Sequence, residues 1–174
     1  MVTKNSLGKT LSILKGFENP EFMLEQYITP SEIASDFLWL CYMQGDIKNK
    51  IIADFGCGTG ILGIGALLLG AKKVFFIDKS ENALKIAKKN FNLLKLDKRR
   101  AVFLCEDVKK FSNSVDSVIE NPPFGVKNKH ADKGFLEKAV KISNKIYSFH
   151  KIESEKFIKK FSKDNGFSNK LVFV

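Results

Sequence analysis

Short apolar runs rich in β-branched and aromatic residues alternate with longer stretches whose apolar residues recur at helical spacing. The runs suit buried strands, and the stretches between them suit amphipathic helices. Such alternation predicts an α/β fold with a mostly parallel sheet and helices on both faces, because parallel strands need crossover connections. The predicted strands are residues 50–54, 73–78, 101–105, 115–120, 144–149 and 168–174. The predicted helices include residues 7–15, 60–69, 80–91, 133–143 and 152–164.

A further helix is predicted to begin at the sequence Thr29-Pro30-Ser31-Glu32. Thr and Glu three positions apart form a capping box, and proline is favoured at the first helical position. We therefore expect Thr29 to cap this helix. The sequence contains neither repeats nor a proline-rich linker, so it predicts one domain, with an N-terminal arm and helices over residues 1–45 and a core over residues 46–174.

A glycine-rich loop follows the first predicted strand. The strand ends in Asp54, and Gly56, Gly58 and Gly60 precede an apolar helix. Glycine lets the backbone approach a ligand closely, and the N-terminus of the helix offers unpaired N–H groups. The spacing Gly58-x-Gly60-x-x-Gly63 also fits a dinucleotide-binding loop, so the glycines alone leave the cofactor open.

Two acidic residues bear on the choice of cofactor. Asp78 ends the second predicted strand, where its carboxylate can accept hydrogen bonds from both hydroxyls of a ribose in either kind of nucleotide. Asp54 favours S-adenosylmethionine, because that cofactor carries an ammonium group and has no pyrophosphate for the loop to bind. The ligand crevice is expected at the carboxyl ends of the strands, where the chain reverses direction across the sheet.

The sequence Asn121-Pro122-Pro123-Phe124 directly follows the fourth predicted strand. Two prolines remove two backbone donors and fix φ, so the chain leaves the sheet in a stiff turn. There the Asn121 side-chain oxygen and the Pro122 carbonyl can accept both N–H bonds of a flat exocyclic amine, while Phe124 stacks on its ring. The plain alternative is an ordinary turn, since Asn and Pro are common in turns. The glycine loop upstream favours a functional turn.

This turn suits a particular reaction. An exocyclic aromatic amine is a weak nucleophile, because its lone pair is delocalised into the ring. Once both of its N–H bonds are held, the lone pair points at the sulfonium methyl group for in-line displacement. Catalysis is then positioning and electrostatics, without a metal or a covalent intermediate, and the base must leave its stack to reach the site.

The chain resembles the class I S-adenosylmethionine-dependent methyltransferases with an Asn-Pro-Pro-Phe/Tyr motif, and within them the methyltransferase-like 5 family of small-subunit ribosomal RNA adenosine N6-methyltransferases. The resemblance spans residues 7–165. It rests on Leu24-Glu25-Gln26-Tyr27-Ile28-Thr29, Asp54-Phe55-Gly56-Cys57-Gly58-Thr59-Gly60, Ile77-Asp78, Glu106-Asp107-Val108, Asn121-Pro122-Pro123-Phe124-Gly125 and Tyr147-Ser148-Phe149-His150-Lys151.

The resemblance implies a Rossmann-like class I methyltransferase fold, an S-adenosylmethionine cofactor and an N-terminal arm that closes over it. It also implies a small zinc-binding activator subunit that adds a strand to the open edge at residues 101–105, and ribosomal RNA as substrate. Family members continue through a final antiparallel pair of strands, so in this chain that pair is expected to be incomplete.

The predicted site residues come partly from the sequence patterns and partly from the family resemblance. Asp107 follows the third strand, where it can accept the adenine amino group of the cofactor or act as an ordinary cap. The predicted catalytic residues are Asn121, Pro122, Pro123 and Phe124. The predicted cofactor-binding residues are Gln26, Tyr27, Thr29, Asp54, Gly56, Gly58, Thr59, Gly60, Asp78, Asp107, Val108 and Asn121.

The chain is strongly basic, with a net charge of +10 that comes mostly from lysine. Residues 127–170 hold twelve lysines against five acids, a balance of +7, and residues 95–100 form a second basic cluster. A lysine-rich surface is also typical of thermostable proteins, but the excess favours a polyanionic partner. The candidate RNA contacts directly follow the Asn-Pro-Pro turn: Lys127, Lys129, His130 and Lys133. The plain alternative is that they belong to an ordinary surface loop.

Length and composition argue against a membrane protein, a secreted protein and a protein built around disulfides or a metal. A length of 174 residues with 44% hydrophobic content indicates one globular domain. The apolar runs are too short to cross a bilayer and the N-terminus lacks a signal peptide, so a soluble cytoplasmic protein without a membrane partner is expected. The three cysteines and two histidines are far apart, which predicts neither a disulfide framework nor a metal site.

Three other functions stay open at this point. A glutamine N5-methyltransferase of a translation release factor needs the same grip on a carboxamide nitrogen, although that class favours Tyr where this chain has Phe124. A catalytically idle RNA-binding or assembly module would keep the fold, but the intact Asp54, Asp78 and Asn121 argue against it. A nicotinamide oxidoreductase would need a substrate domain, which the sequence lacks.

Overall fold

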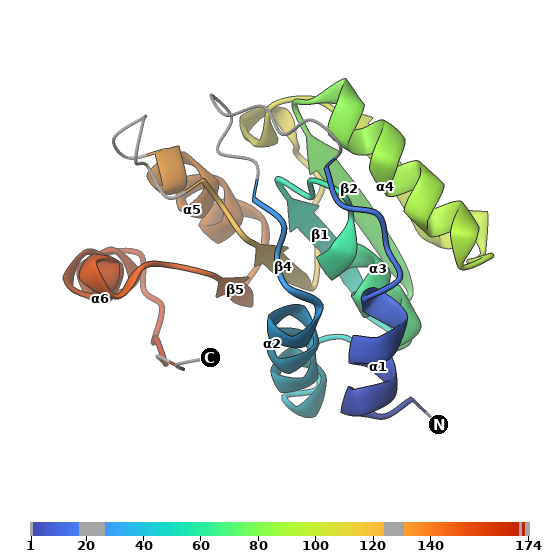
Figure 1. The fold of residues 1–174 in the computed structure, drawn as a ribbon. Coiled ribbons are helices and arrows are strands. Elements are labelled where there is room, and N and C mark those ends of the chain that lie inside the picture. The colour runs from blue at the N-terminus through green and yellow to red at the C-terminus, as the bar shows by residue number, and fades with distance from the viewer. Residues whose placement is uncertain (1, 18–26, 124–130, 171, 173–174) are drawn as a thin grey trace.

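The computed structural model describes residues 2–17, 27–123, 131–170 and 172. Within these residues, parallel strands form one sheet of five in the order β3-β2-β1-β4-β5 (Figure 1). The strands are β1 Ile51–Phe55, β2 Lys73–Asp78, β3 Ala101–Cys105, β4 Ser117–Glu120 and β5 Ile146–Ser148. The prediction of a parallel sheet is confirmed, and so is the prediction that the third strand lies at an edge.

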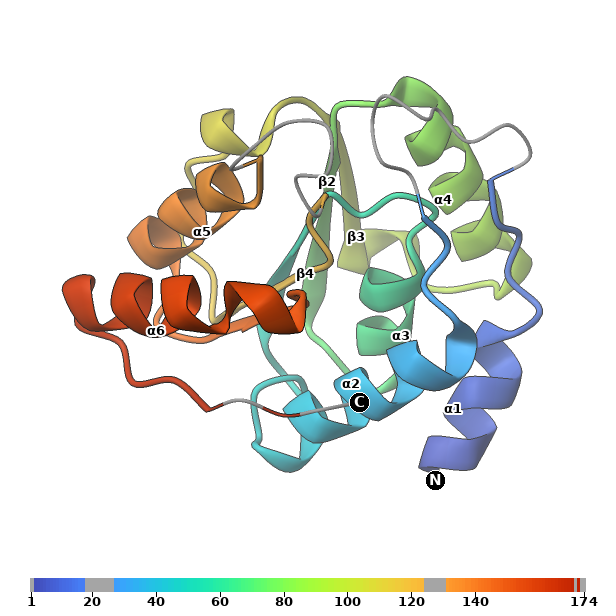
Figure 2. The ribbon, with the colours of Figure 1, turned by 60° about the vertical axis from the view of Figure 1, so that its left-hand side comes forward.

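Helices flank the sheet on both sides (Figure 2). The α-helices are α1 Lys4–Leu11, α2 Ser31–Met43, α3 Ile61–Leu68, α4 Glu81–Leu93, α5 Ala131–Ile142 and α6 Glu155–Asp164. Among the described residues, three short 3-10 helices join them: η2 Lys98–Arg100, η3 Val108–Lys110 and η4 Ile152–Ser154. Each helix in the described ranges is too short or too polar to span a bilayer.

The two faces of the sheet carry separate cores, because successive side chains of a strand point to opposite faces. On one face Phe76 of β2 packs with helices α1 to α4, for example through Leu38 of α2 and Phe91 of α4. On the other face Phe55 of β1 packs with Ala139 of α5 and with the segment around η3. With both faces covered, the carboxyl edge of the strands is left for a ligand.

Helix α1 begins at Lys4 rather than residue 7 and ends at Leu11 rather than residue 15. Its start is set by a reciprocal cap that the sequence analysis missed. The Ser6 N–H donates to Thr3 Oγ1 at 3.1 Å, and the Thr3 N–H donates to Ser6 Oγ at 2.9 Å. A serine takes the place of the Glu or Gln expected in a capping box, and it satisfies the same backbone donors.

The predicted cap of α2 is wrong. The residue at the N-cap is Pro30, and among the described residues this helix end receives no hydrogen bond from a capping side chain. The Pro30 carbonyl accepts the Ala34 N–H at 2.9 Å as the first bond of the helix. The Thr29 hydroxyl instead accepts a hydrogen bond from Asn121, which places it in the candidate site.

The terminal strand predicted over residues 168–174 is also wrong where the chain is described. Residues 168–170 and 172 belong to no strand, and residues 171, 173 and 174 lie outside the described residues. The Phe167 N–H bonds back to the Ser162 carbonyl at 2.8 Å, closing the end of α6. A strand requires ladder hydrogen bonds to a neighbour, and an apolar run alone does not provide them.

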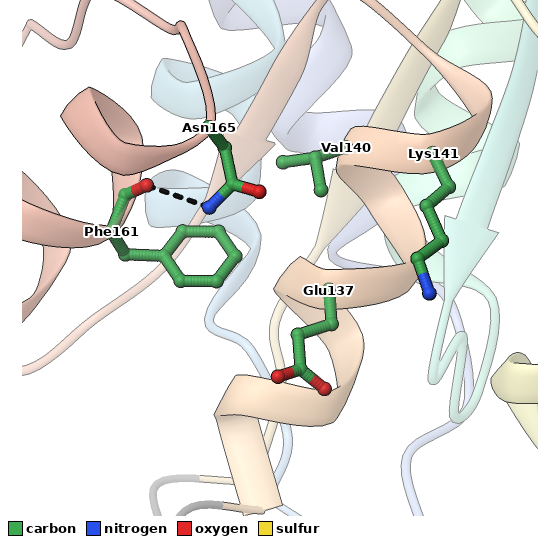
Figure 3. A pocket seen from close by; sticks show the side chains of 5 residues that line it. All are labelled: Glu137, Val140, Lys141, Phe161 and Asn165. Carbon is green, nitrogen blue, oxygen red and sulfur yellow. Dashed lines mark hydrogen bonds between the residues drawn. The ribbon is translucent and has the colours of Figure 1, made fainter.

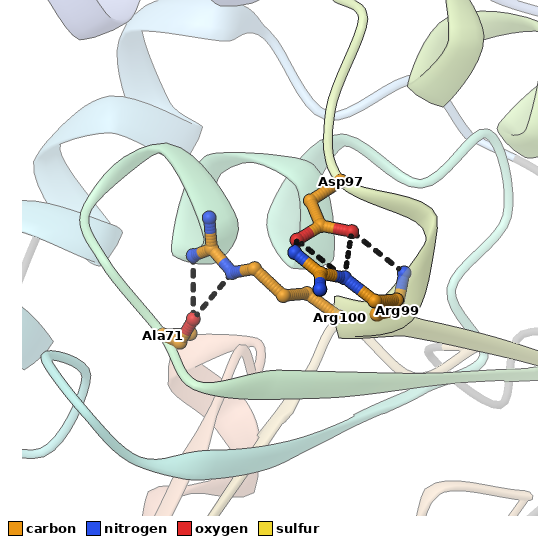
Figure 4. A network of polar contacts seen from close by, with 4 residues as sticks. All are labelled: Ala71, Asp97, Arg99 and Arg100. Carbon is orange, nitrogen blue, oxygen red and sulfur yellow. Dashed lines mark hydrogen bonds and ion pairs between the residues drawn. The ribbon is translucent and has the colours of Figure 1, made fainter.

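The two arginines of the second basic cluster bind other groups of the protein (Figure 4). The guanidinium of Arg100 donates to the Ala71 carbonyl through Nε at 3.1 Å and to the Leu67 carbonyl at 2.8 Å, so it closes the end of α3. Arg99 pairs with Asp97 at 2.8 Å, and hydrogen bonds from Arg99 lower the pKa of Asp97 to about 2. These two arginines therefore contribute less to a polyanion-binding surface than their sequence suggests.

Candidate functional site

The candidate site lies at the carboxyl ends of the three central strands, β2, β1 and β4. There the chain reverses the direction in which it crosses the sheet. Strand β1 lies between β2 and β4, and the register pairs Phe55 with Ile77 on one side and with Glu120 on the other. The loop after β1 therefore emerges between the end of β2, which carries Asp78, and the end of β4, which precedes Asn121. The sheet thus brings together three separate motifs of the sequence, at the crevice expected for such a topology.

The glycine loop is held to the end of β2 by Asp78. The Gly58 N–H donates to Asp78 Oδ2 at 2.8 Å, and the Ser80 N–H donates to Asp78 Oδ1 at 2.8 Å. Gly58 has a φ of 53°, in the left-handed region that favours glycine. Because a carboxylate oxygen has more than one acceptor position, Asp78 shapes the loop and keeps capacity for a ligand's hydroxyl groups.

Asp54 lies beneath this loop and is 1% exposed. Its Oδ2 accepts the Gly63 N–H at 2.8 Å, so the carboxylate binds a free donor in the first turn of α3. Burial raises the pKa of Asp54 to about 7, with a smaller contribution from the charge of Asp78, while the bond from Gly63 opposes the rise. A cation placed next to Asp54 would therefore favour its charged form.

Asn121 directly follows β4, as predicted. Its Nδ2 donates to Thr29 Oγ1 at 2.9 Å, a bond between residues 92 positions apart in the chain. Pro122 is buried and Pro123 is half-buried, so the turn is packed against the protein. The bond to Thr29 uses an N–H of the amide and leaves the acceptor capacity of Asn121 Oδ1 for another group.

Asp107 and Val108 follow β3 at the same edge of the sheet. Asp107 is exposed and caps η3, because its Oδ1 accepts the Lys109 N–H at 2.8 Å. Val108 is buried among the residues that pack on Phe55. The capping role weighed for Asp107 from the sequence is therefore present, and it leaves one carboxylate oxygen outside the cap.

Several predicted site residues cannot be placed at this edge. Tyr27 is described and is 55% exposed. Lys133 lies at the start of α5, where it pairs with Glu137 at 3.4 Å. The remaining predictions lie outside the described residues: Gln26, Phe124, Lys127, Lys129 and His130.

Two further polar residues, Glu120 and Asn90, are buried here and were not predicted from the sequence as site residues. Glu120, the last residue of β4, is 0% exposed, and its Oε1 accepts a hydrogen bond from Ser148 Oγ at 2.8 Å. Asn90 of α4 is 1% exposed and hydrogen bonds to the glycine loop. An acid at the end of an apolar run could have identified Glu120 as a candidate site residue. A single Asn within an amphipathic helix gives no such indication for Asn90.

A hollow elsewhere on the molecule does not belong to this site. Helices α5 and α6 flank a space of about 360 Å³ lined by Glu137, Val140, Lys141, Phe161 and Asn165 (Figure 3). None of the predicted cofactor-binding or catalytic residues lines it. Its polar groups are partly used within α6, since Asn165 Nδ2 donates to the Phe161 carbonyl at 2.8 Å.

Known proteins share this arrangement to different extents. Residues 39–122 match the family described as ribosomal protein L11 methyltransferase (PrmA), a segment that includes the glycine loop, Asp78 and Asn121. The rRNA N(6)-adenosine-methyltransferase METTL5 of Danio rerio is 37% identical over 163 residues, which cover 91% of this chain and 79% of that protein.

Two archaeal proteins are also similar over nearly the whole chain. An uncharacterized protein of Methanocaldococcus jannaschii is 37% identical over 178 residues, covering 95% of this chain and 79% of that protein. The crystal structure of a candidate RNA methyltransferase from Pyrococcus horikoshii has a TM-score of 0.88 at 47% identity, covering 94% of this chain and 82% of that one. The similarity therefore extends beyond the loop to the N-terminal helices and to the segment after the Asn-Pro-Pro turn.

Proposed function

The chain belongs to the METTL5-like family of rRNA N6-adenosine methyltransferases, which depend on S-adenosylmethionine, and we propose that it methylates the N6 amine of an adenosine in small-subunit ribosomal RNA. The observation that carries this proposal is the hydrogen bond from Asn121 to Thr29 at the end of β4. That bond fixes an amide next to the glycine loop with its oxygen available to accept a hydrogen bond.

In the proposed reaction Asn121 and the turn orient the target amine. Asn121 Oδ1 and the Pro122 carbonyl accept its two N–H bonds, so the nitrogen lone pair faces the methyl group of the cofactor. A new C–N bond forms as the C–S bond breaks, the sulfur keeps the bonding electron pair, and the methylated nitrogen then loses a proton. The protein contributes orientation and hydrogen-bond acceptors, and Phe124 is proposed to stack on the base.

The cofactor is proposed to lie along the carboxyl ends of β1, β2 and β3. Asp78 accepts the ribose hydroxyls, Asp107 accepts the adenine amino group, and Asp54 faces the ammonium group at the other end. The buried Asp54 supports this assignment, because a buried carboxylate is costly unless a cation or hydrogen-bond donors accompany it. The remaining proposed contacts come from the arm, the loop and the residue after Asp107: Gln26, Tyr27, Thr29, Gly56, Gly58, Thr59, Gly60 and Val108.

The charge of the molecule supports an RNA substrate. The excess of lysine gives a net charge of +10, and exposed lysines of α6, such as Lys156, Lys160 and Lys163, add to the basic surface. Phosphate contacts from lysine supply much of the affinity of proteins for nucleic acids. The loop residues Lys127, Lys129 and His130, together with Lys133, remain proposed RNA contacts.

A partner is proposed at the open edge of the sheet. Strand β3 pairs with β2 alone among the described strands, so its outer side is available to a strand of another chain. Main-chain pairing of this kind is a common mode of association, and the proposed partner is a small zinc-binding activator subunit.

The substrate is tested by offering labelled S-adenosylmethionine to the protein, with the activator subunit, in the presence of small-subunit ribosomal RNA or of a release factor. Nucleoside analysis should find the label in N6-methyladenosine. Label in a glutamine of the release factor would replace the proposal with the glutamine N5-methyltransferase alternative. Cofactor binding without transfer to either acceptor would favour the non-catalytic module.

A further inference from the structure

Asn90 connects the N-terminal arm to the glycine loop through three hydrogen bonds. Its Oδ1 accepts the Lys15 N–H at 2.8 Å, and its Nδ2 donates to the Lys15 carbonyl at 2.9 Å and to the Thr59 carbonyl at 3.0 Å. The side chain thus binds both polar groups of one residue in the arm, as a neighbouring strand would. At the same time it binds a residue of the loop proposed to hold the cofactor.

The same segment of the arm places an aromatic ring on the loop. A Cβ atom built on Gly58 would lie 3.2 Å from Cζ of Phe17, two residues beyond the anchored Lys15. Phe17 is half-buried there. Because Gly58 also donates its N–H to Asp78, the ring packs on the part of the loop that is fixed to the proposed ribose-binding carboxylate.

The two described parts of the arm also contact each other. A Cβ atom built on Gly16 would collide with Cδ1 of Ile28, so Ile28 packs directly on the backbone next to Lys15. Thr29, the next residue, accepts the hydrogen bond from Asn121. One asparagine therefore anchors the arm at the glycine loop, and another joins it to the catalytic turn.

We propose that Asn90 is a positioning residue for cofactor binding, which acts by holding the arm so that Phe17 covers the glycine loop. This inference rests on the proposed position of the cofactor. Both N–H groups of the Asn90 amide are used, and the residue is buried, so no water can replace an interaction that is lost. Substitution by aspartate keeps the size of the side chain and replaces both donors with an acceptor that faces two carbonyls.

The test compares Asn90→Asp with Asn92→Asp, the same change at an exposed position of the same helix. Titration calorimetry with S-adenosylmethionine should show about tenfold weaker binding for Asn90→Asp, the scale of one lost hydrogen bond, and unchanged binding for Asn92→Asp. The KM for the cofactor should rise by a similar factor, while kcat at saturating cofactor stays within about twofold. A purely structural role would lower the fraction of folded protein and kcat without changing the affinity of the folded molecules.

A second variant keeps the inference testable if Asn90→Asp folds poorly. Phe17→Ala leaves Asn90 and its bonds to the backbone in place, and it should weaken cofactor binding by a similar factor. In the double variant the two effects should not add, because both remove the same cover from the loop. Unchanged affinity in Phe17→Ala, or additive effects in the double variant, would overturn the inference. Unchanged cofactor affinity in Asp78→Ala would instead contradict the proposed cofactor site.

Discussion

Asn121 Nδ2 lies 2.9 Å from Thr29 Oγ1, so the residue proposed to orient the substrate amine is itself oriented by the N-terminal arm. An amide can rotate and exchange its oxygen for its nitrogen. In the structure the nitrogen faces the arm, where the Thr29 hydroxyl accepts its N–H. With the nitrogen bonded to Thr29, the oxygen is the end of the Asn121 amide that is available to the substrate.

Replacing Thr29 tests this relationship. Thr29→Val keeps the shape of the side chain and removes the hydroxyl, so kcat should fall by about twofold to tenfold, as for a hydrogen bond between uncharged groups worth about 0.5 to 1.5 kcal/mol. Thr29→Ser keeps the hydroxyl and should retain most of the activity. Steady-state kinetics of both variants measure the difference. If Thr29→Val and Thr29→Ser lost equal activity, the hydroxyl would have no part in orienting Asn121.

The affinity for S-adenosylmethionine should rise with pH up to about 7. In the cofactor-free protein burial raises the pKa of Asp54 to about 7, and the neighbouring Asp78 and Cys57 supply no positive charge. The cofactor's ammonium group favours the charged carboxylate, so below this pKa binding must release a proton from Asp54 and becomes weaker. Above it Asp54 is already charged, and the dependence on this group flattens.

Calorimetry in buffers with different ionisation enthalpies measures the proton release directly. Asp54→Asn should abolish both the release and the pH dependence over this range, whereas Asp36→Asn, a partly exposed acid on α2, should leave both unchanged. Binding that releases no proton near pH 7 would contradict the placement of the ammonium group beside Asp54.

Asp78→Ala should weaken cofactor binding by about 1.5 to 3 kcal/mol, the scale of hydrogen bonds to a charged group. The variant loses the proposed ribose contacts and also the bonds that hold Gly58 and Ser80. Asp116→Ala is a suitable control, because Asp116 accepts a backbone hydrogen bond at 2.7 Å at the opposite, amino end of the strands. Unchanged affinity for Asp78→Ala would remove Asp78 from the site.

A test of the proposed partner surface on β3 needs a substitution that leaves the core intact. Phe103 is unsuitable, because its ring stacks on Phe76 at 4.6 Å and meets Phe91 at 5.7 Å. Val102 is half-buried and belongs to neither main core cluster, so Val102→Lys introduces a charge at the edge at a smaller cost to packing.

Gel filtration with the activator subunit should show a heterodimer for the wild-type protein and a weakened one for Val102→Lys. Leu93→Lys, on the exposed side of α4, is the matched control and should associate normally. A wild-type protein that stays monomeric and fully active in the presence of the activator would rule the partnership out.

Much of the fold could be predicted from the sequence, because the periodicities of strands and helices are local signals. Parallel strands joined by helices can also be arranged in a sheet in only a few orders. The carboxyl-edge placement of Asp54, Asp78 and Asn121 followed for the same reason. Thr29 was misassigned because a capping box is a local rule, and its actual partner, Asn121, is 92 positions away. Asn90 was missed because its hydrogen bonds go to backbone groups of the arm and the loop, which no sequence pattern reveals.

The central claim is that Asn121 orients an adenosine amine for methyl transfer, and single-turnover transfer tests it most directly. Wild-type protein and Asn121→Ala are loaded with labelled S-adenosylmethionine and mixed with small-subunit ribosomal RNA, and the nucleosides are then analysed. The wild-type protein should yield N6-methyladenosine. Asn121→Ala should yield almost none while its cofactor affinity stays within a few-fold, because the lost interaction acts mainly in the transition state. Transfer by Asn121→Ala at more than about half the wild-type rate, or label in a nucleoside other than N6-methyladenosine, would contradict the claim.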